Sequence, residues 1–108
     1  KSNKELFYCQ GKEASAIGEL TDDGFLVYKD GKANIETTKG MNKWIGVLRK
    51  RLIEEDILKK EDNVYIFQQD YIFNSPSAAS ATVLGRSSNG WMSWKDKNGK
   101  TLDELKRK

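Results

Sequence analysis

The sequence is poor in several residue types on which common functions depend. It has no histidine, one cysteine and one proline among 108 residues. Histidine is the commonest general base and the commonest metal ligand, so its absence removes the simplest catalytic and metal-site designs. The single cysteine, Cys9, excludes an internal disulfide and any zinc site with several cysteine ligands. We interpret Cys9 as a buried, unreactive thiol on a strand, in a protein of a reducing compartment.

Long apolar runs are also missing. No stretch approaches the roughly 20 residues that a membrane-spanning helix needs, and no signal-peptide pattern opens the chain. With 37% hydrophobic and 32% charged residues, the composition is typical of a polar globular domain. We therefore expect a cytoplasmic protein with no membrane partner.

The length is that of one domain. The chain starts at Lys1 rather than at a methionine, and it ends in a charged stretch, Asp103–Lys108. We expect residues 1–108 to form a single domain, excised from the C-terminal part of a larger protein. Nothing in the sequence indicates an oligomeric state.

The basic residues are concentrated in two segments, although the net charge of the chain is only +3. Residues 24–53 hold seven lysines and arginines against two acids, a net charge of +5. Residues 86–100 hold four against one, a net charge of +3. If the fold brings the two segments together, the protein has a positive face that attracts phosphate. The alternative is an ordinary solvated surface.

The hydrophobic pattern predicts an α+β fold with an antiparallel sheet of about five strands. Short apolar runs that suit strands lie at residues 6–9, 14–20 and 24–29, and residues 64–67 and 71–73 suit either one bent strand or two short ones. The Asp23-Gly24 pair is typical of a hairpin turn, and the strand after it has apolar residues on both faces, so we expect it to be central. We also expect a strand at Trp91–Lys97, between the turn pairs Asn89-Gly90 and Asn98-Gly99.

Two main helices and a short C-terminal helix complete the predicted fold. Apolar residues recur at intervals of three and four from about Met41 to Leu58, which predicts the first helix. Its apolar stripe contains Met41, Trp44, Ile45, Leu48 and Leu52, and the opposite side carries Lys39, Lys43 and Lys50. These lysines therefore face solvent or a ligand.

The start and end signals of the other two helices are local. Ser75 before Pro76 predicts a helix start, and Gly85 predicts its end in a left-handed conformation. The alanines between them allow a close approach to a neighbouring element. The pair Thr101 and Glu104 forms a capping box that opens the C-terminal helix.

We expect no catalytic residues, no metal and no cofactor. Ser75 and Ser77 have no base near them in sequence, so helix capping is the preferred interpretation. Asp70, Asp96 and Lys97 resemble a nuclease arrangement only at a spacing that is common by chance. The acids around Glu54 are better explained as a solvated helix end than as a cation site, and no Gly-rich motif of the nucleotide-binding type occurs.

The loop of residues 86–90 offers binding chemistry instead. Arg86 can bind guanine or phosphate, Asn89 can bind adenine, and Trp91 or Trp94 can stack on an exposed base. Each also has a structural interpretation: the tryptophans as covers of the core, Asn89 as a turn residue, and Arg86 as half of a surface ion pair. On a strand, Trp91 and Trp94 project to opposite faces, so at most one would reach a ligand.

The order of several motifs resembles a known family. They are Gly24–Val27, Phe73–Ala79, Val83–Ser87, Asn89–Lys95 and Gly99–Leu102. The chain resembles, over most of its length, the domain-of-unknown-function family 4357, an accessory module mainly of bacterial restriction and nuclease-type proteins. It is also similar to restriction enzyme adenine methylase associated domains, which have been proposed to recognise modified DNA. One departure is Asp30-Gly31-Lys32, where the family more often has Gly-Ser directly after the strand.

The resemblance and the basic segments together predict non-catalytic DNA binding, with the reading of modified DNA as a variant, by an accessory module of a restriction-modification or nuclease protein. The partners would be DNA and the parent enzyme's domains in the same chain. The expected DNA-binding residues are Lys29, Lys32, Lys43, Lys50, Ser75, Ser77, Arg86, Asn89, Trp91 and Lys95. The alternative is a structural interaction module that packs against the parent enzyme.

The lack of histidine and of a paired nucleophile and base generates a first prediction. The isolated domain should neither cleave nor modify DNA, with or without magnesium, when plasmid and oligonucleotide substrates are followed on gels. Metal-dependent nicking that is lost in Asp70→Ala or Asp96→Ala would contradict it.

Overall fold

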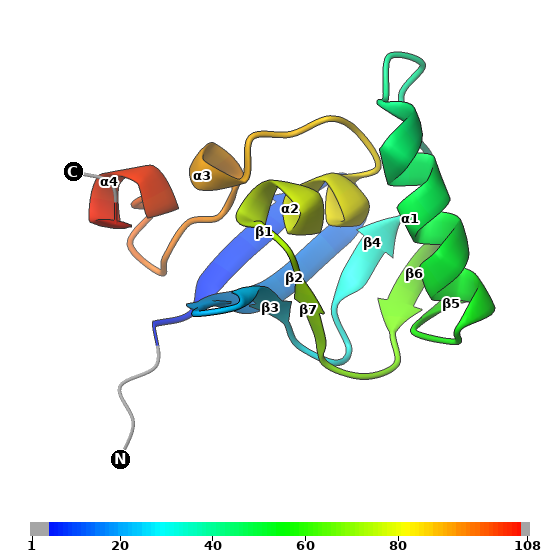
Figure 1. Cartoon of the computed structure of the whole chain (residues 1–108), viewed down its shortest axis with the longest axis horizontal. Coiled ribbons are helices and arrows are strands. Elements are labelled where there is room, and N and C mark those ends of the chain that lie inside the picture. Colours follow the sequence, from blue (N-terminus) through cyan, green and yellow to red (C-terminus); the bar gives the residue numbers. More distant parts are fainter. Residues whose placement is uncertain (1–4, 107–108) are drawn as a thin grey trace.

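The computed structural model describes residues 5–106, and Figure 1 shows how its elements are arranged. Lys1 and the end of the charged C-terminal stretch, residues 107–108, lie outside the described residues. The strands are β1 (Phe7–Gly11), β2 (Ala14–Thr21), β3 (Gly24–Val27), β4 (Lys32–Asn34), β5 (Leu58–Glu61), β6 (Val64–Phe67) and β7 (Tyr71–Phe73). The helices are α1 (Lys43–Glu54), α2 (Pro76–Leu84), α3 (Gly90–Ser93) and α4 (Leu102–Lys106). The predicted α+β fold with an antiparallel sheet and a short C-terminal helix is confirmed.

The sheet is organised around β2. Gly18 of β2 pairs with Phe7 of β1 on one edge and with Val27 of β3 on the other. β4 pairs with β2 through Ser15 and Lys32, on the edge of β2 that also pairs with β3. From there the sheet divides, because β3 continues to β7 while β4 continues to β6 and β5. The prediction of a central strand after Gly24 is confirmed, since β3 lies between β2 and β7.

The helices cover one face of the sheet. α2 packs against β1, β2, β3, β4 and β7, and α1 packs against α2 and β5. Figure 1 shows α2 over the sheet, with α1 on one side of it and α3 and α4 on the other. Ala14 and Ala16 of β2 are buried on this side, whereas Ser15 and Ile17 are exposed on the opposite side. We call that opposite side the open face.

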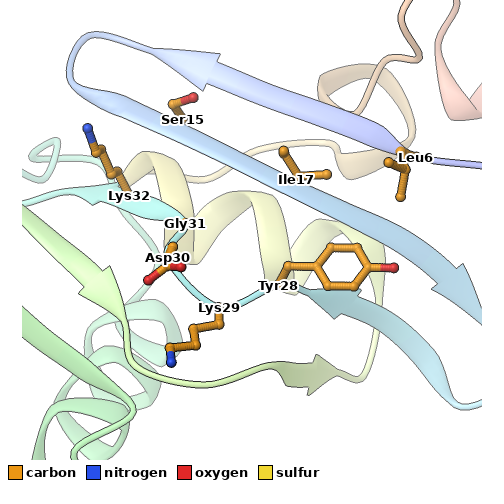
Figure 2. A pocket seen from close by; sticks show the side chains of 8 residues that line it. All are labelled: Leu6, Ser15, Ile17, Tyr28, Lys29, Asp30, Gly31 and Lys32. Atoms are coloured by element: carbon orange, nitrogen blue, oxygen red, sulfur yellow. The ribbon is translucent and has the colours of Figure 1, made fainter.

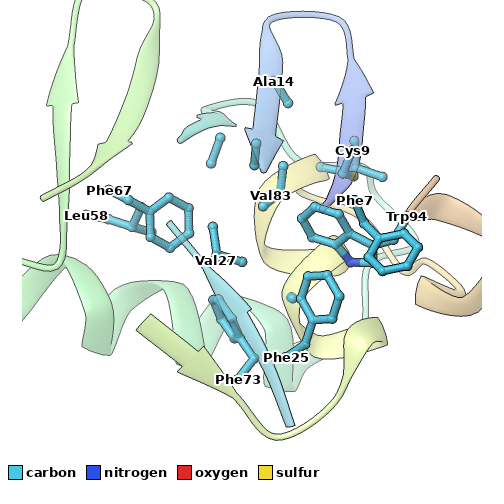
Figure 3. Packing of buried hydrophobic residues seen from close by; sticks show 14 of the residues in the cluster. Phe7, Cys9, Ala14, Phe25, Val27, Leu58, Phe67, Phe73, Val83 and Trp94 are labelled. Atoms are coloured by element: carbon cyan, nitrogen blue, oxygen red, sulfur yellow. The ribbon is translucent and has the colours of Figure 1, made fainter. Parts of the chain in front are cut away.

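The core lies between the sheet and α2. Trp94 and Phe25 are fully buried, with ring centroids 4.4 Å apart. Figure 3 shows these two rings with Phe7 at one end of the cluster, and Leu58 and Phe67 at the other. Cys9 is 1% exposed on β1, as expected, and burial raises the pKa of its thiol to about 12.

α2 has almost no exposed side, and its N-terminal end is held by later residues. The Ser75 hydroxyl accepts the Ala78 N–H at 3.0 Å, which confirms the predicted cap. The Trp94 indole N–H donates to the Pro76 carbonyl at 3.0 Å, and the Gly90 N–H donates to the Ser77 hydroxyl at 2.9 Å. These bonds explain the Ser-Pro-Ser and Asn-Gly-Trp motifs as one packing unit.

The C-terminal end of α2 is also buried and satisfied. Gly85 has φ 75°, the predicted left-handed cap, and its N–H donates to the Ala81 carbonyl at 2.8 Å. The Asn34 amide donates to the Leu84 carbonyl at 3.2 Å. The Arg49 guanidinium donates to the Thr82 carbonyl at 3.0 Å, and also to the carbonyls of Asn34 and Ile35. Carbonyls that would otherwise be buried without donors are thus satisfied.

The first predicted helix is shorter than expected. It ends at Glu54 rather than Leu58, because Asp56 has φ 60° and Leu58 begins β5. Leu58 is buried opposite Phe67 in the sheet. It lies six residues after Leu52, so it falls off the three- and four-residue spacing of the helix. β4 and β5, which the sequence did not predict, account for the seven strands of residues 5–106 where about five were expected.

The strand predicted at Trp91–Lys97 is wrong. The Asn89 side chain accepts the Trp91 N–H at 3.0 Å and starts the short helix α3. Trp91 and Trp94 therefore do not alternate across a strand: Trp94 is fully buried, and Trp91 is half-buried against the same core. An Asn-Gly pair caps a helix here instead of turning a hairpin. Beyond α3, Lys95 forms an isolated bridge with Tyr8.

The other local signals are confirmed. Thr21 and Gly24 pair across the hairpin turn between β2 and β3. In the capping box, the Thr101 hydroxyl accepts the Glu104 N–H and the Glu104 carboxylate accepts the Thr101 N–H, both at 3.1 Å. These features depend on neighbours in sequence, which is why sequence reasoning finds them.

The contact between Gly90 and α2 generates a prediction on stability. A Cβ at Gly90 would lie 2.1 Å from the Pro76 carbonyl carbon and 2.4 Å from the Ser77 nitrogen. We expect Gly90→Ala to lower the free energy of unfolding by roughly 3 kcal/mol, measured by urea denaturation, because backbone must move. Gly40→Ala is the matched control, since no atom lies within 4 Å of its Cβ. Equal stability of the two variants would contradict the packing role.

The buried guanidinium generates a second prediction on stability. Arg49 is 5% exposed, and its side chain lies 5.5 Å from the centroid of the Tyr65 ring. Arg49→Ala leaves buried carbonyls without donors, so we expect a loss of roughly 3 kcal/mol in unfolding free energy. Arg51→Ala, two residues later on the exposed side, should change it by less than about 0.5 kcal/mol. Similar urea midpoints for both variants would refute this role of Arg49.

Candidate nucleic-acid interface

The structure distributes the ten expected DNA-binding residues over three places. Four lie around the N-terminal end of α2 and the start of α3: Ser75, Ser77, Asn89 and Trp91. Three lie on α1 and directly after α2: Lys43, Lys50 and Arg86. Three lie on the sheet side of the molecule: Lys29, Lys32 and Lys95.

The first group already has partners inside the fold. Ser75 caps α2, Ser77 accepts the Gly90 N–H, and Asn89 caps α3. Trp91 packs against the core. These contacts account for the four residues by packing and hydrogen bonding, so a contact with DNA is not needed to explain their presence, although it stays a prediction.

The two basic segments meet beside the C-terminal end of α2. The Thr38 N–H donates to the Gly85 carbonyl at 3.1 Å, and the Asn42 N–H donates to the Ser87 hydroxyl at 3.3 Å. These bonds hold the loop before α1 against the loop after α2. Exposed basic residues flank both bonds in sequence: Lys39, Lys43 and Arg86. The junction therefore brings Arg86 of the second basic segment to the first segment, whereas Lys95 and Lys97 of the second segment lie beside Tyr8.

α1 extends this charge along its exposed side. Ile45 and Leu52 point into the protein, as predicted, and the exposed side carries Lys43, Lys50 and Arg51. Glu54, in the last turn, is the acid of this helix. We define the basic surface as Lys39, Lys43, Lys50, Arg51 and Arg86, together with the exposed Trp44.

The structure corrects the prediction that Trp44 belongs to the inward-facing apolar stripe of α1. Its side chain is 47% exposed, and Val47, one turn later, is 69% exposed. Trp44 lies at one edge of the apolar stripe of α1. Arg49 lies at the other edge, and it is buried together with Ile45 and Leu52. An exposed indole on a helix that also carries exposed cations can stack on a base or cover an apolar patch of a protein.

The charges of the basic surface are not consumed by neighbouring acids. Among residues 5–106 the salt bridges join Lys12 to Glu36 and Lys106 to Glu5, and both pairs lie outside the basic surface. Arg49, which sequence reasoning counted as part of the basic segment, does not belong to it. Its place four residues after Ile45 and three before Leu52 was the available signal that it points inward.

Lys29 and Lys32 lie apart from the basic surface, at a shallow hollow of about 500 Å³ in the open face. Figure 2 shows them with Leu6, Ile17 and Tyr28 at the margin of this hollow. Lys95 is exposed beyond β1, where it pairs with Tyr8. The expected site is therefore not one continuous patch.

The acids that resemble a nuclease arrangement are bonded to backbone. The Asp70 carboxylate accepts the Lys29 N–H at 2.8 Å, and the Asp96 carboxylate accepts the N–H groups of Asn98 and Lys100, both at 2.9 Å. Within residues 5–106 no group of three or more histidine, cysteine or acidic side chains is placed to hold a metal. The same part of the chain has no helix of the length and apolarity needed to cross a membrane.

Comparison with known proteins gives a family and no function. No curated protein and no solved structure matches the chain. A family model matches residues 7–106, which include every strand and helix described above. The chain therefore belongs to the family described as Domain of unknown function (DUF4357).

Proposed function

We propose that the domain binds DNA without catalysis, through the basic surface, as an accessory module of a restriction-modification or nuclease protein. The observation that carries the proposal is the pair of hydrogen bonds, Thr38 to Gly85 and Asn42 to Ser87, that joins the two basic segments. Five cations around one helix and the adjoining loop match a run of phosphates better than a single small anion.

The chemistry of these residues supports contact with the DNA backbone first. Lysine and arginine bound to phosphate displace condensed counterions, and this supplies affinity that does not depend on sequence. Arg86 is the residue of the basic surface that can also read a guanine edge, because a guanidinium donates two parallel hydrogen bonds. Any preference for a sequence or a modification would then come from Arg86 and Trp44.

A second candidate function is an interaction module that packs against its parent enzyme. Trp44 and Val47 favour it, because two large exposed apolar side chains one turn apart suit a protein contact. The basic residues of the same surface make the two candidate functions separable by the salt dependence of binding. Binding to phosphates is steeply dependent on salt, whereas an apolar protein contact is not.

The salt dependence provides the prediction. The logarithm of the affinity for labelled duplex DNA, measured by fluorescence anisotropy at several salt concentrations, should fall linearly with the logarithm of the salt concentration, at a slope of roughly −0.9 per phosphate contact. Lys43→Gln and Arg86→Gln should each reduce the slope by about one contact and weaken binding roughly eightfold at 0.1 M salt. Lys97→Gln, an exposed lysine in the turn after α3, serves as the matched control and should leave both values unchanged.

Two results would decide against the proposal. One is the absence of duplex binding at low salt by the folded domain, which leaves the interaction module as the function. The other is an equal loss of affinity in Lys43→Gln, Arg86→Gln and Lys97→Gln, which would show general charge attraction and no defined surface.

A further inference from the structure

The open face has its own ordered pattern of side chains. Phe7 and Cys9 of β1 are buried on the α2 side, so Tyr8 between them lies on the open face. Its neighbours across the sheet share that face. They are Ile17, opposite Tyr8 on β2, and Lys95, which exchanges backbone hydrogen bonds with Tyr8 at 2.7 and 3.1 Å.

Tyr28 completes this row. Its N–H donates to the Ile17 carbonyl at 3.0 Å, so it lies directly across from Ile17, one step beyond the last paired residue of β3. The first row of the open face therefore reads Lys95, Tyr8, Ile17 and Tyr28, with one residue from each successive strand or strand extension. The two rings are two strands apart, about 10 Å, which separates them enough to contact different groups.

A second row runs parallel to the first, two residues along the strands. Its register is given by the pairs Gln10 with Ser15, Ser15 with Lys32, Lys32 with Ile66 and Ile66 with Lys59. The lysines of this row, Lys32 and Lys59, are both exposed. The open face thus carries an aromatic row beside a row with two cations.

The hollow lies where the strand containing β3 and β4 is interrupted. Lys29 to Gly31 bulge out of regular pairing, with Asp30 at φ 76°. The Asp30 N–H donates to the Phe67 carbonyl at 2.8 Å, and the Phe67 N–H donates to the Gly31 carbonyl at 2.9 Å, which holds the bulge in place. The bulge places Lys29 and Lys32 on either side of the hollow, with Asp30 as the acid between them.

Tyr28 is held as a fixed and neutral ring. Its hydroxyl donates to the Glu19 carboxylate, and burial together with this bond raises its pKa to about 12. Figure 2, which looks onto the open face with α2 behind the strands, shows the flat side of the ring turned outward, next to Ile17 and Leu6. A ring in one fixed orientation loses little entropy when a planar group stacks on it.

We propose that the open face binds single-stranded DNA, with bases stacked on Tyr28 and Tyr8 and phosphates contacting Lys29, Lys32 and Lys95. Stacking needs planar rings that solvent reaches, and the backbone needs cations near them; Tyr8 and Tyr28 are each half-buried, and Lys29, Lys32 and Lys95 are exposed. A free nucleotide would cover the hollow alone and leave Tyr8, Lys95 and Lys59 without contacts, so the length of the pattern favours a strand. The surface is separate from the one assigned to duplex DNA, and the two proposals stand or fall independently.

The test uses a fluorescein-labelled oligothymidylate of about ten nucleotides, titrated with the whole chain at low salt. Tyr28→Leu should weaken binding roughly 5- to 100-fold, because stacking on one ring is lost. Tyr28→Phe keeps the ring and removes only the hydroxyl, so it should stay within about twofold of the unchanged chain. Lys32→Gln, on an exposed strand position, should weaken binding and lower the salt slope by about one contact.

Crossed measurements separate the two surfaces. Tyr28→Leu should weaken oligothymidylate binding by a larger factor than duplex binding, and Lys43→Gln should weaken duplex binding by a larger factor than oligothymidylate binding. Wild-type affinity of both folded Tyr28→Leu and Lys32→Gln for the oligomer would overturn the proposal. If Tyr28→Leu does not fold, Tyr8→Leu takes its place, because Tyr8 is the second ring of the proposed stack and its loss should also weaken oligomer binding. Competition by thymidine monophosphate as strong as by the oligomer would overturn the assignment to a strand.

Discussion

The burial of α2 on all its sides is the constraint on which the rest of the structure depends. α2 lies between the sheet and two other helices, so the backbone groups left over at its ends cannot turn to water. At the N-terminal end the Ser75 hydroxyl accepts a backbone N–H, and at the C-terminal end Asn34, Arg49 and Gly85 donate to backbone carbonyls. Trp94 adds a hydrogen bond to the Pro76 carbonyl, which ties the residues after α2 to its first turn. Most of the motifs that characterise the sequence are therefore the partners of one helix.

This constraint also determines where a ligand can bind. Side chains directed at α2 are used in packing, which leaves the outward sides of the two layers for recognition. One is the exposed side of α1 with the adjoining Arg86, and the other is the open face of the sheet. The molecule measures 34 × 32 × 24 Å, so ligands bound to the two surfaces would lie within the dimensions of one small domain.

The features that were predicted correctly from the sequence are stabilised by residues that lie close together in the chain. The Asp-Gly hairpin, the Ser75 cap, the Gly85 cap and the capping box each involve residues within a few positions of one another. Asn89 shows the limit, because an Asn-Gly pair suits a hairpin turn as well as a helix cap, and the choice is made by Gly90 fitting against Pro76. β4 was missed because it is three residues long and its partners, β2 and β6, are far away in sequence. β5 was missed although β6 follows it after two residues, because only Leu58 of its four residues is apolar. The rows of the open face depend on strand register, which no single strand encodes.

The dependence of α2 on distant partners has a consequence for how the chain acquires its structure. Nine residues are too few for a stable helix in isolation, and α2 lacks the charged side chains that support exposed helices. Its first turn is completed by residues 90 and 94, which come after it, and its last turn by residues 34 and 49, which come before it. We therefore expect secondary and tertiary structure around α2 to form together in one cooperative step, and a fragment ending at Leu84 to be an unfolded chain instead of a smaller domain.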